Sequence, residues 1–514
     1  MRILYFLAHP NDIGGAAMVL IKHAYIAQNL KHSVKLILQQ NANGKYINEY
    51  DEILSDYGIE YSSARFTIAT QMEDIDLAHA ITDYDDIKAI ILQYRPDIIH
   101  SIQLNITVEM VSRELDIPHI MSIYPVATST FNIRWVDYYP HYLCGDSLYF
   151  CNRWGLGLGI ESRCISIPYE AKQLPMKQEE NSSIKILCVA TFTPYKNQLE
   201  ILKSIKRCVS KGIRIDATFL GDCNGVYGDT CKDYIDEHEL KEIVHFMGRV
   251  KDVEEYYLTA DVLIHASEIE SLPGVIIEAM ANKVLVITTA PGGVPEIIQD
   301  LDNGIIIDGY ESDNIYNALM KYVELPENKV LDILDEAYRT YCEHNTYEAV
   351  GAVLINYYKS VCADYKKNKI NRSNYPGIGD ALRLVKGFLE KYDVSQYTLR
   401  HVYYLYHLKN QIMYKDDVYI WGCGNNSDLA LEWCKLIGVN VSGFIDKKSI
   451  DYHHGYCVFR PDVEIVSKAK VIIVCVQKYS LVEDIVKILE LCGKVRNQDY
   501  FLLFNDFFLV DIEK

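Results

Sequence analysis

Short apolar runs alternate with longer amphipathic segments along the first part of the chain. Three of the short runs occupy residues 3–8, 33–40 and 95–102, and each is followed by polar residues. The segment that follows Gly14 and Gly15 instead places its apolar residues at helical spacing. Strands that alternate with helices of this length form a parallel sheet with helices on both faces. The pattern therefore predicts an α/β fold.

The same alternation begins again near residue 183 and once more near residue 416. A polar segment with Pro376 and two glycines separates the last unit from the rest, which is typical of a linker. We predict a first domain over residues 1–168, a second over 169–345 and a helix over 346–365 that returns to the first domain. A linker with helices over 366–415 and a third domain over 416–514 complete the chain.

Composition limits the classes of protein to which the chain can belong. With 514 residues it is too long for one hydrophobic core. Its net charge of −19 argues against a nucleic-acid partner, because phosphate backbones are bound by clustered Lys and Arg. The fourteen cysteines show no Cys-x-x-Cys pair and no zinc-finger spacing, which favours a reduced, cytoplasmic protein.

The expected location follows from the apolar runs as well. The N-terminus lacks the features of a signal peptide, and no apolar run approaches 18 residues. We expect a cytoplasmic protein. The four basic residues of the linker leave contact with the inner face of the plasma membrane as an alternative.

Residues 268–298, EIESLPGVIIEAMANKVLVITTAPGGVPEII, carry the densest chemical signal. The stretch predicts a loop with Glu270, a helix that begins at Gly274 and carries Glu278, a buried strand, and a glycine-rich turn before another helix. Helix N-termini present unpaired N–H groups that suit a phosphate. Ionised carboxylates only accept hydrogen bonds, so hydroxyl groups are their natural partners. A ligand with both phosphates and hydroxyls, such as a nucleotide-sugar, fits this combination.

Glu270 and Glu278, with seven residues between them and followed by GGVPEII, resemble the signature of the retaining glycosyltransferases of family 4. The resemblance covers roughly residues 1–360. It implies the GT-B fold, in which two Rossmann-like domains face a cleft, here with a third C-terminal Rossmann-like α/β domain. It also implies a retaining, hexosyltransferase-type enzyme that moves a sugar from a nucleotide-diphosphate-sugar to an acceptor, without a metal or other cofactor. Synthesis of a bacterial surface polysaccharide or glycoconjugate is the expected setting.

The resemblance assigns roles to individual residues. Glu278 would bind the donor ribose, Glu270 the hydroxyls of the transferred sugar, and Lys196 the diphosphate, so Glu270 and Lys196 are the expected catalytic residues. The backbone and side chains of a wider set would complete the donor site: Gly14, Gly15, Thr191, Gly248, Arg249, Val250, Leu272, Gly274 and Val275.

Two positions depart from the family pattern. Thr191 stands where the family has an Arg, so one cation for the diphosphate is missing. Tyr124 stands where the family often has a His that faces the sugar, and tyrosine does not share the titration behaviour of histidine. Acidic residues at 73–76 and 83–86 have the Asp-x-Asp spacing of a metal site in another glycosyltransferase fold. We expect them at solvated helix starts, where carboxylates are favoured.

The third domain begins with a strand, a Gly422-Cys423-Gly424 turn, a helix and a strand that ends before Asp446. Asp446 lies near the distance at which a ribose-binding acid is found in Rossmann domains. The segment resembles the small Rossmann-like domains of bacterial sugar acetyltransferases and surface-polysaccharide enzymes. Gly422, Gly424 and Asp446 are therefore candidates for a second ligand site. A structural role, in which this domain joins copies of the chain or binds a partner subunit, is the alternative.

Other functions remain open at this point. The acceptor can be a glycan, a lipid-linked molecule or a protein. The same fold also serves phosphorylase-type and hydrolase-type enzymes. A non-catalytic nucleotide-sugar sensor or assembly subunit is a further alternative, suggested by Thr191 and Tyr124.

Overall fold

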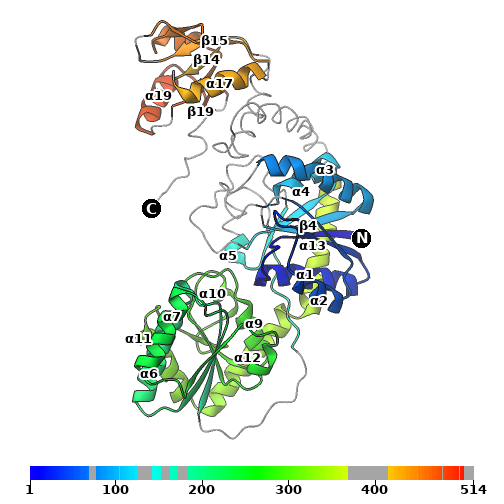
Figure 1. Cartoon of the computed structure of the whole chain (residues 1–514), viewed down its shortest axis with the longest axis vertical. Helices are drawn as coiled ribbons and strands as arrows, with labels where there is room; N and C mark the ends of the chain where they lie inside the picture. The colour runs from blue at the N-terminus through cyan, green and yellow to red at the C-terminus, as the bar shows by residue number, and fades with distance from the viewer. Residues whose placement is uncertain are drawn as a thin grey trace.

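The computed structural model describes residues 1–66, 68, 77–103, 105–124, 142–151, 162–171, 183–367, 412 and 415–502, the last range without 437, 449, 477, 478 and 497. Three α/β lobes lie along the long axis, and the first lobe is between the third and the second (Figure 1). Each lobe is built on a mainly parallel sheet. Most of the predicted linker, residues 368–411, and the acidic residues 73–76 lie outside the described residues.

The first sheet has seven parallel strands in the order β3-β2-β1-β4-β5-β6-β7. Its strands are β1 Arg2–Leu7, β2 Ser33–Gln39, β3 Tyr61–Ala64, β4 Ile98–Ile102, β5 His119–Ser122, β6 Tyr142–Gly145 and β7 Ser162–Cys164. Its helices are α1 Gly15–Asn29, α2 Glu49–Asp56, α3 Leu77–Tyr94, α4 Ile106–Glu114 and α5 Leu148–Cys151.

Strand β1 shows why this sheet is buried on both faces. Successive strand residues point to opposite faces, and Tyr5 packs in the cluster that includes α1 whereas Leu4 and Phe6 pack in the cluster that includes α3 and α4. An uninterrupted apolar run is what a strand covered by helices on both sides requires. The α3 and α4 cluster continues into core residues of the third lobe, including Val418 and Phe444.

The acidic residues 83–86 are not at a helix start, contrary to the sequence prediction. They lie inside α3, which begins at Leu77. Asp83 is buried, and Asp85 and Asp86 are exposed. Apolar residues at helical spacing, such as Ile87 and Ile91, extend this helix through the acidic cluster.

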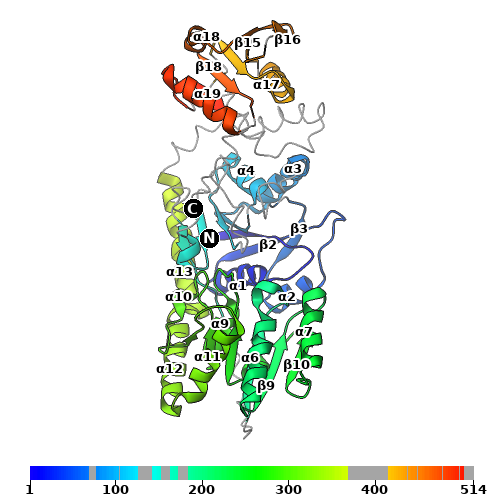
Figure 2. The same ribbon diagram turned by 90° about the vertical axis from the view of Figure 1, so that its left-hand side faces the viewer.

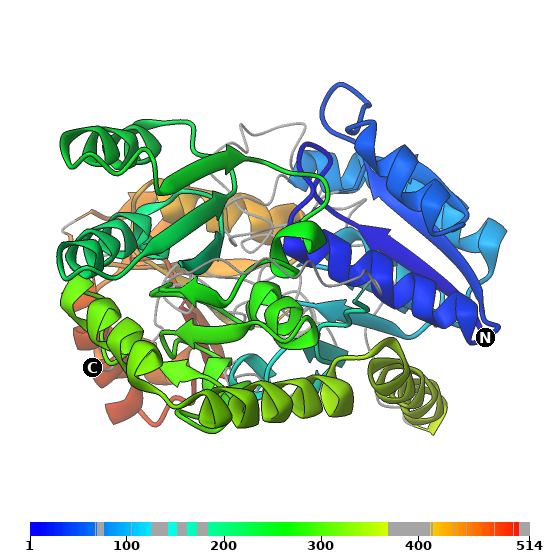
Figure 3. The same ribbon diagram turned by 90° about the horizontal axis from the view of Figure 1, so that it is seen from below.

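The second sheet has six parallel strands in the order β10-β9-β8-β11-β12-β13. They are β8 Ile184–Val189, β9 Ile215–Leu220, β10 Val244–Gly248, β11 Val262–His265, β12 Leu285–Thr288 and β13 Ile305–Ile306. The chain also forms the 3-10 turn η4 Pro194–Lys196 and the helices α6 Gln198–Ser210, α7 Val226–Glu237, α8 Glu254–Tyr257, α9 Gly274–Ala281, α10 Val294–Ile297, α11 Ser312–Glu324 and α12 Glu327–His344. Figure 3 shows this lobe end-on, with helices on both sides of its sheet.

A long helix connects the second lobe back to the first. Helix α13, Tyr347–Lys367, runs alongside the first lobe (Figure 2) and packs on α1. The contact is close, since a side chain at Gly351 would lie 2.8 Å from Ile26. Tyr358 reaches into the first core, where its hydroxyl lies 2.6 Å from His100 Nδ1. None of the described helices combines the length and the apolar composition that crossing a bilayer requires.

The third sheet has the strand order β16-β17-β15-β14-β18-β19. Its strands are β14 Val418–Trp421, β15 Val441–Ile445, β16 Tyr452–His453, β17 Tyr456–Phe459, β18 Val471–Val474 and β19 Tyr500–Leu502, and only the β16–β17 pair is antiparallel. The helices are α17 Asn425–Leu436, α18 Val463–Lys468 and α19 Tyr479–Leu491. The predicted α/β class, with three Rossmann-like sheets, is confirmed.

Candidate active site

The loops that follow β8, β11 and β12 bring the main candidate residues together at the carboxyl ends of the second sheet. In open parallel sheets, ligands bind at this edge. Strand β11 ends at His265, the loop after it carries Glu270, and α9 begins at Gly274 after Pro273 in extended conformation. The site is therefore assembled from loops that are each fixed by a buried strand.

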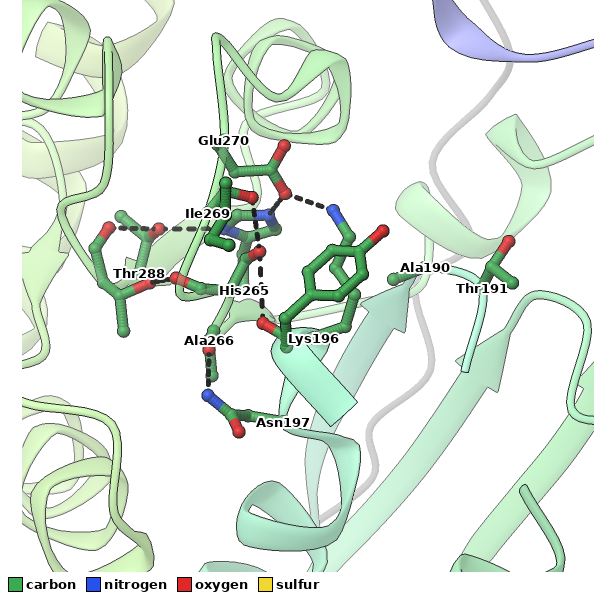
Figure 4. Close-up of polar contacts among 12 residues, drawn as sticks. Ala190, Thr191, Lys196, Asn197, His265, Ala266, Ile269, Glu270 and Thr288 are labelled. Atoms are coloured by element: carbon green, nitrogen blue, oxygen red, sulfur yellow. Dashed lines mark hydrogen bonds and ion pairs between the residues drawn. The ribbon is translucent and has the colours of Figure 1, made fainter. Parts of the chain in front are cut away.

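Glu270 lies between two positively polarised groups (Figure 4). Its Oε1 accepts a hydrogen bond from Lys196 Nζ in a close ion pair and lies 2.9 Å from His265 Nε2. Burial opposes the ionised form, but the hydrogen bonds and charges of His265 and Lys196 outweigh it and lower the pKa of Glu270 to about 2. Glu270 is therefore an ionised, nearly buried carboxylate.

His265 was missed by the sequence analysis. It is the last residue of the apolar strand β11, and its side chain is only 4% exposed. Its Nδ1 lies 3.2 Å from the hydroxyl of Thr288, the last residue of neighbouring β12. A polar residue that ends a buried strand at the carboxyl edge of a sheet is the sequence signal that would have identified it.

Lys196 reaches Glu270 because its turn is tied to the loop after β11. Asn197, in left-handed conformation, donates from Nδ2 to the carbonyl of Ala266 at 2.9 Å, and the Glu268 N–H donates to the carbonyl of Tyr195 at 2.8 Å. The two expected catalytic residues thus contact each other directly. Thr191 lies in the same loop with an exposed side chain, and its carbonyl accepts a hydrogen bond from Gln198.

Glu278 lies on α9 and has partners of its own. The hydroxyl of Tyr257, on α8, donates to Glu278 Oε2 at 2.9 Å. Burial raises the pKa of Glu278, while Lys22 and the Tyr257 hydrogen bond act in the opposite direction. Lys22 belongs to α1 of the first lobe, and burial lowers its pKa. Neither Tyr257 nor Lys22 was identified from the sequence, because neither belongs to the stretch that carries Glu270 and Glu278.

Contacts between the first two lobes flank Glu270. The carboxylate of Glu296 accepts hydrogen bonds from the backbone N–H groups of Leu148 and Tyr149, at 2.7 and 2.6 Å. The hydroxyl of Ser271 donates to Asp146. Burial raises the pKa of Asp146 to about 7, although the Ser271 hydrogen bond opposes the shift.

Gly292 and Gly293 allow these loops to approach one another. Gly292 has a φ of 57°, and a Cβ there would lie 2.0 Å from the carbonyl oxygen of Glu270. A Cβ on Gly293 would lie 2.4 Å from the Cβ of Ser147 in the first lobe. The glycine-rich turn predicted to face a phosphate is thus packed against the Glu270 loop and the first lobe.

The other donor-site candidates divide into two groups. Gly14 and Gly15 open α1 with open space where a side chain would be, and Arg249 donates to Asp12 in the preceding loop at 2.7 Å. Both partners of this ion pair are exposed, so it contributes little stability. The pair nevertheless brings the turn at Gly248, Arg249 and Val250 to the loop of Gly14.

The second group lies around the start of α9. The side chain of Leu272 packs in the core, whereas Gly274 and Val275 form the first turn of α9.

Tyr124 follows β5 and contacts core residues of both of the first two lobes. Burial raises its pKa well above the usual value for tyrosine. The side chain therefore stays protonated and can donate a hydrogen bond. It cannot act as a titrating group near neutral pH.

Gly422, Gly424 and Asp446 line one cavity of about 470 Å³ in the third lobe. Among the described residues, one group could hold a metal ion, Asp428 with His453 and His454, and it also lies in the third lobe. The Glu270 and Glu278 site is thus separate from both of these features.

The second lobe is similar to a known protein family. Residues 171–340 match the family model described as glycosyl transferases group 1. N-acetyl-alpha-D-glucosaminyl L-malate synthase of Bacillus anthracis is 27% identical over 205 residues, which are 38% of this chain and 51% of that protein. The capsular polysaccharide biosynthesis glycosyltransferase CapH of Staphylococcus aureus is 32% identical over 114 residues, 22% of this chain and 31% of CapH. The chain thus spans about half the length, or less, of these curated relatives.

Solved structures resemble a large part of this chain. A glycosyltransferase from Rickettsia africae has a TM-score of 0.60 and 17% identity, over 70% of this chain and 98% of that one. Anabaena HepE in complex with UDP has a TM-score of 0.58 and 15% identity, over 70% of this chain and all of HepE. At such identities the likeness concerns the fold alone, and it confirms the predicted GT-B fold.

Proposed function

We propose that this chain, whose residues 171–340 match a glycosyltransferase family model, is a retaining glycosyltransferase that uses a nucleotide-diphosphate-sugar donor. One observation carries the proposal. An ionised, nearly buried carboxylate, Glu270, pairs with Lys196 at the carboxyl edge of the second sheet, beside the first turn of α9. A cation, a carboxylate and free N–H groups at one edge can bind a diphosphate and the hydroxyls of a sugar together.

Lys196 is proposed to bind the donor diphosphate. Its ammonium would exchange part of its interaction with Glu270 for the phosphate oxygens, and the N–H groups of Gly274 and Val275 in α9 would add hydrogen bonds. Because Thr191 brings no positive charge, Lys196 carries more of the neutralisation than in a site with two cations. Catalysis then rests on positioning and on stabilisation of the leaving group by fixed charges.

Glu270 and Glu278 are proposed to contact different parts of the donor. Glu270 would accept hydrogen bonds from the hydroxyls of the transferred sugar, with its orientation fixed by His265. Glu278 would accept from the ribose hydroxyls, with Tyr257 holding one carboxylate oxygen. Gly14, Gly15 and the turn at Gly248–Val250 would close over the donor from either side.

The reaction follows from this arrangement. The bond between the anomeric carbon and the diphosphate oxygen breaks, and the hydroxyl oxygen of the acceptor bonds to the same face of that carbon. The proton of the acceptor hydroxyl leaves with the nucleoside diphosphate. Tyr124, at the junction of the two lobes, is proposed as a neutral hydrogen-bond donor to the sugar or acceptor.

The comparisons suggest where to look for substrates. HepE is solved with UDP-glucose, so UDP-sugars are the first donors to test. CapH acts in capsular polysaccharide biosynthesis, which favours an acceptor in a surface polysaccharide or glycoconjugate. All fourteen cysteines are free, as expected for an enzyme of the reducing cytoplasm. Association with a second copy or another subunit is proposed to use the third lobe.

A second candidate function rests on Thr191 and on the altered Tyr124 position. A nucleotide-sugar sensor or assembly subunit would bind the donor without transferring the sugar. Such a protein would bind the donor yet release no nucleotide with any acceptor.

The test is a transfer assay with UDP-glucose, UDP-galactose and UDP-N-acetylglucosamine, each with and without oligosaccharide or lipid-linked acceptors. Acceptor-dependent UDP release and a product with the anomeric configuration of the donor, read by NMR, are expected. A product of inverted configuration would contradict the retaining mechanism. UDP release at the same rate without an acceptor would indicate a hydrolase.

A further inference from the structure

The cavity of the third lobe lies at the point where the order of its sheet reverses. From β14 the chain moves outward to β15 and β17, and then returns to β18 on the other side of β14. The residues that follow β14 and β18 line the cavity, whose volume is about 470 Å³. In open α/β sheets the crevice at this switch point, outside the carboxyl ends of the strands, is where ligands bind. Most small-molecule sites are also of this size.

The glycine loop at Gly422–Gly424, which lines the cavity, has a backbone conformation fixed by its own residues. Gly422 has a φ of 122°, a conformation that side chains rarely adopt, and a side chain at Gly424 would project into open space. The Gly424 N–H donates to Ser427 Oγ at 2.7 Å, and the Ser427 hydroxyl lies 2.5 Å from the carbonyl of Gly424. Ser427 is buried. The loop is thus held by its own hydrogen bonds.

Polar and apolar groups of the cavity come from different elements of the lobe. Asp446 follows β15, and its Oδ1 accepts from the backbone N–H of Lys448 at 2.8 Å. The Lys448 ammonium lies 3.5 Å from the carbonyl of Cys423, in the glycine loop. Leu481 and Ile485, both from α19, provide an apolar wall. A carboxylate accepts hydrogen bonds from hydroxyls, an ammonium binds phosphate, and an apolar wall packs against a flat ring.

We propose that this cavity binds a ribonucleotide. Asp446 accepts hydrogen bonds from the ribose hydroxyls, Lys448 binds the phosphate above the Gly422–Gly424 loop, and the base packs against Leu481 and Ile485. The chain then has two nucleotide sites, because this one is independent of Glu270 and Glu278.

Calorimetric titration of the full chain with UDP, GDP and ADP, each separately, tests the proposal. We expect two binding sites per chain. One nucleotide that binds at both sites would give two events in a single titration, and two nucleotides that bind at different sites would give one event each. Asp446→Asn, which keeps an acceptor for the Lys448 N–H, should weaken one event about tenfold to a hundredfold, the loss expected for a charged hydrogen bond. Asp451→Asn, at an exposed carboxylate outside the cavity, is the matched control and should change neither event.

The outcomes distinguish this site from the donor site. Glu278→Gln should weaken the other event and leave the Asp446-dependent event unchanged. The proposal would be overturned if, with each of the three nucleotides, the only event were one that Glu278→Gln weakens and Asp446→Asn does not. A second event that Asp446→Asn leaves unchanged, while thermal unfolding shows the variant to be folded, would also overturn it.

A different observation in the same lobe points to a metal. His453 Nε2 and His454 Nε2 lie 2.7 and 3.0 Å from Asp428 Oδ1, and the three side chains come from α17 and from the tip of the β16–β17 hairpin. The φ angles of His454 and Gly455 are 49° and 83°, as in a two-residue type I′ turn. Such turns favour Asn before Gly, and histidine also adopts positive φ more often than most residues.

The arrangement is close to that of a metal site with an open position. Ligand atoms around a tetrahedral Zn²⁺ are about 3.3 Å apart for bonds of about 2.0 Å, and the ligand atoms of the three side chains lie within 4.8 Å of one another. Phe444 packs edge-on against the His453 ring, with centroids 4.8 Å apart, and so fixes its orientation. His454 is half exposed, which leaves solvent access for a water ligand. We infer that Asp428, His453 and His454 bind a divalent ion of the Zn²⁺ type, which fastens the hairpin to α17.

Titration of the EDTA-treated full chain with Zn²⁺ tests this inference, with cobalt(II) absorption as a second readout. We expect one ion per chain. His454→Asn, which suits the left-handed turn, and Asp428→Asn should each weaken binding at least about tenfold. His245→Asn is the matched control, because His245 also pairs with an aspartate, Asp216, at the surface. Absence of saturable binding, or equal affinity in His454→Asn and the unmodified chain, would overturn the inference.

Discussion

The second and third lobes place their candidate sites at the same edge of similar sheets, but they differ in how deeply the charged groups of the site are buried. In the second lobe, Glu270 is 9% exposed and is paired with Lys196 and His265. In the third lobe, Lys447 and Lys448 are exposed at the rim of a cavity. The fold therefore determines where a ligand can bind, and burial of the charged groups determines how strongly a site can act on it. A buried, preorganised ion pair suits catalysis, whereas an exposed rim suits binding.

The largest expected effect is on the buried pair. Lys196→Met removes the cation proposed to stabilise the departing diphosphate and leaves Glu270 without its ion-pair partner. We expect turnover to fall by about 10²–10³, the usual loss for one preorganised charge-stabilising group. The rate of UDP release in the presence of acceptor measures it. Lys203→Met, which breaks the partly exposed Lys203–Glu200 pair, is the matched control and should leave turnover unchanged.

The pH dependence of stability should separate two buried carboxylates near the lobe junction. The pKa of Glu270 is lowered to about 2, so its contribution to stability is present above pH 4.5 and is lost as pH falls through 2. The pKa of Asp146 is raised to about 7, so its contribution is present below pH 3.8 and is lost as pH rises through 7. Asp146→Asn should therefore flatten the loss of stability between pH 5 and 8, by at least about 1 kcal/mol. The free energy of unfolding, measured with denaturant at pH 5 and at pH 8, tests this. If stability falls as much with pH in Asp146→Asn as in the unmodified chain, the raised pKa of Asp146 is contradicted.

Removal of the third lobe should affect the second lobe only slightly. A chain that ends at Lys367 keeps every residue of the proposed donor site, and we expect its UDP affinity to stay within about twofold. Apolar contacts between the α3 and α4 cluster and the third lobe would become exposed, so lower solubility is expected. Calorimetry with UDP on both chains measures the affinity. A collapse of affinity in a folded, truncated chain would make the third lobe part of the catalytic unit.

The smallest expected effect is that of a chelator on the donor site. The proposed donor site uses Lys196 and backbone N–H groups, whereas the candidate metal ligands lie in the third lobe. EDTA should leave donor affinity unchanged and should lower the melting temperature of the third lobe alone. A loss of donor affinity greater than tenfold would mean that a metal carries the phosphate charge.

The sequence predicted the strands and sheets better than it predicted which side chains contact one another. Apolar runs such as residues 3–8 predict buried strands because burial on both faces leaves no polar positions. The glutamates and Lys196 were found because they occur in a recognisable local pattern. Lys22 and Tyr257 were not, since their interactions with Glu278 arise from packing of other helices against α9, which no local pattern shows. The acidic residues 83–86 were misplaced because local charge favours a helix start, while apolar residues on both sides extend the helix.

The central claim is that Glu278 and Glu270 bind different parts of one nucleotide-sugar. UDP affinity measured by calorimetry on Glu278→Gln and Glu270→Gln, alongside turnover, tests it most directly. Glu278→Gln should weaken UDP about tenfold to a hundredfold through loss of a charged hydrogen bond. Glu270→Gln should leave UDP affinity nearly intact and lower turnover by a similar factor. If Glu270→Gln loses UDP as strongly as Glu278→Gln does, the two carboxylates do not divide the donor in this way.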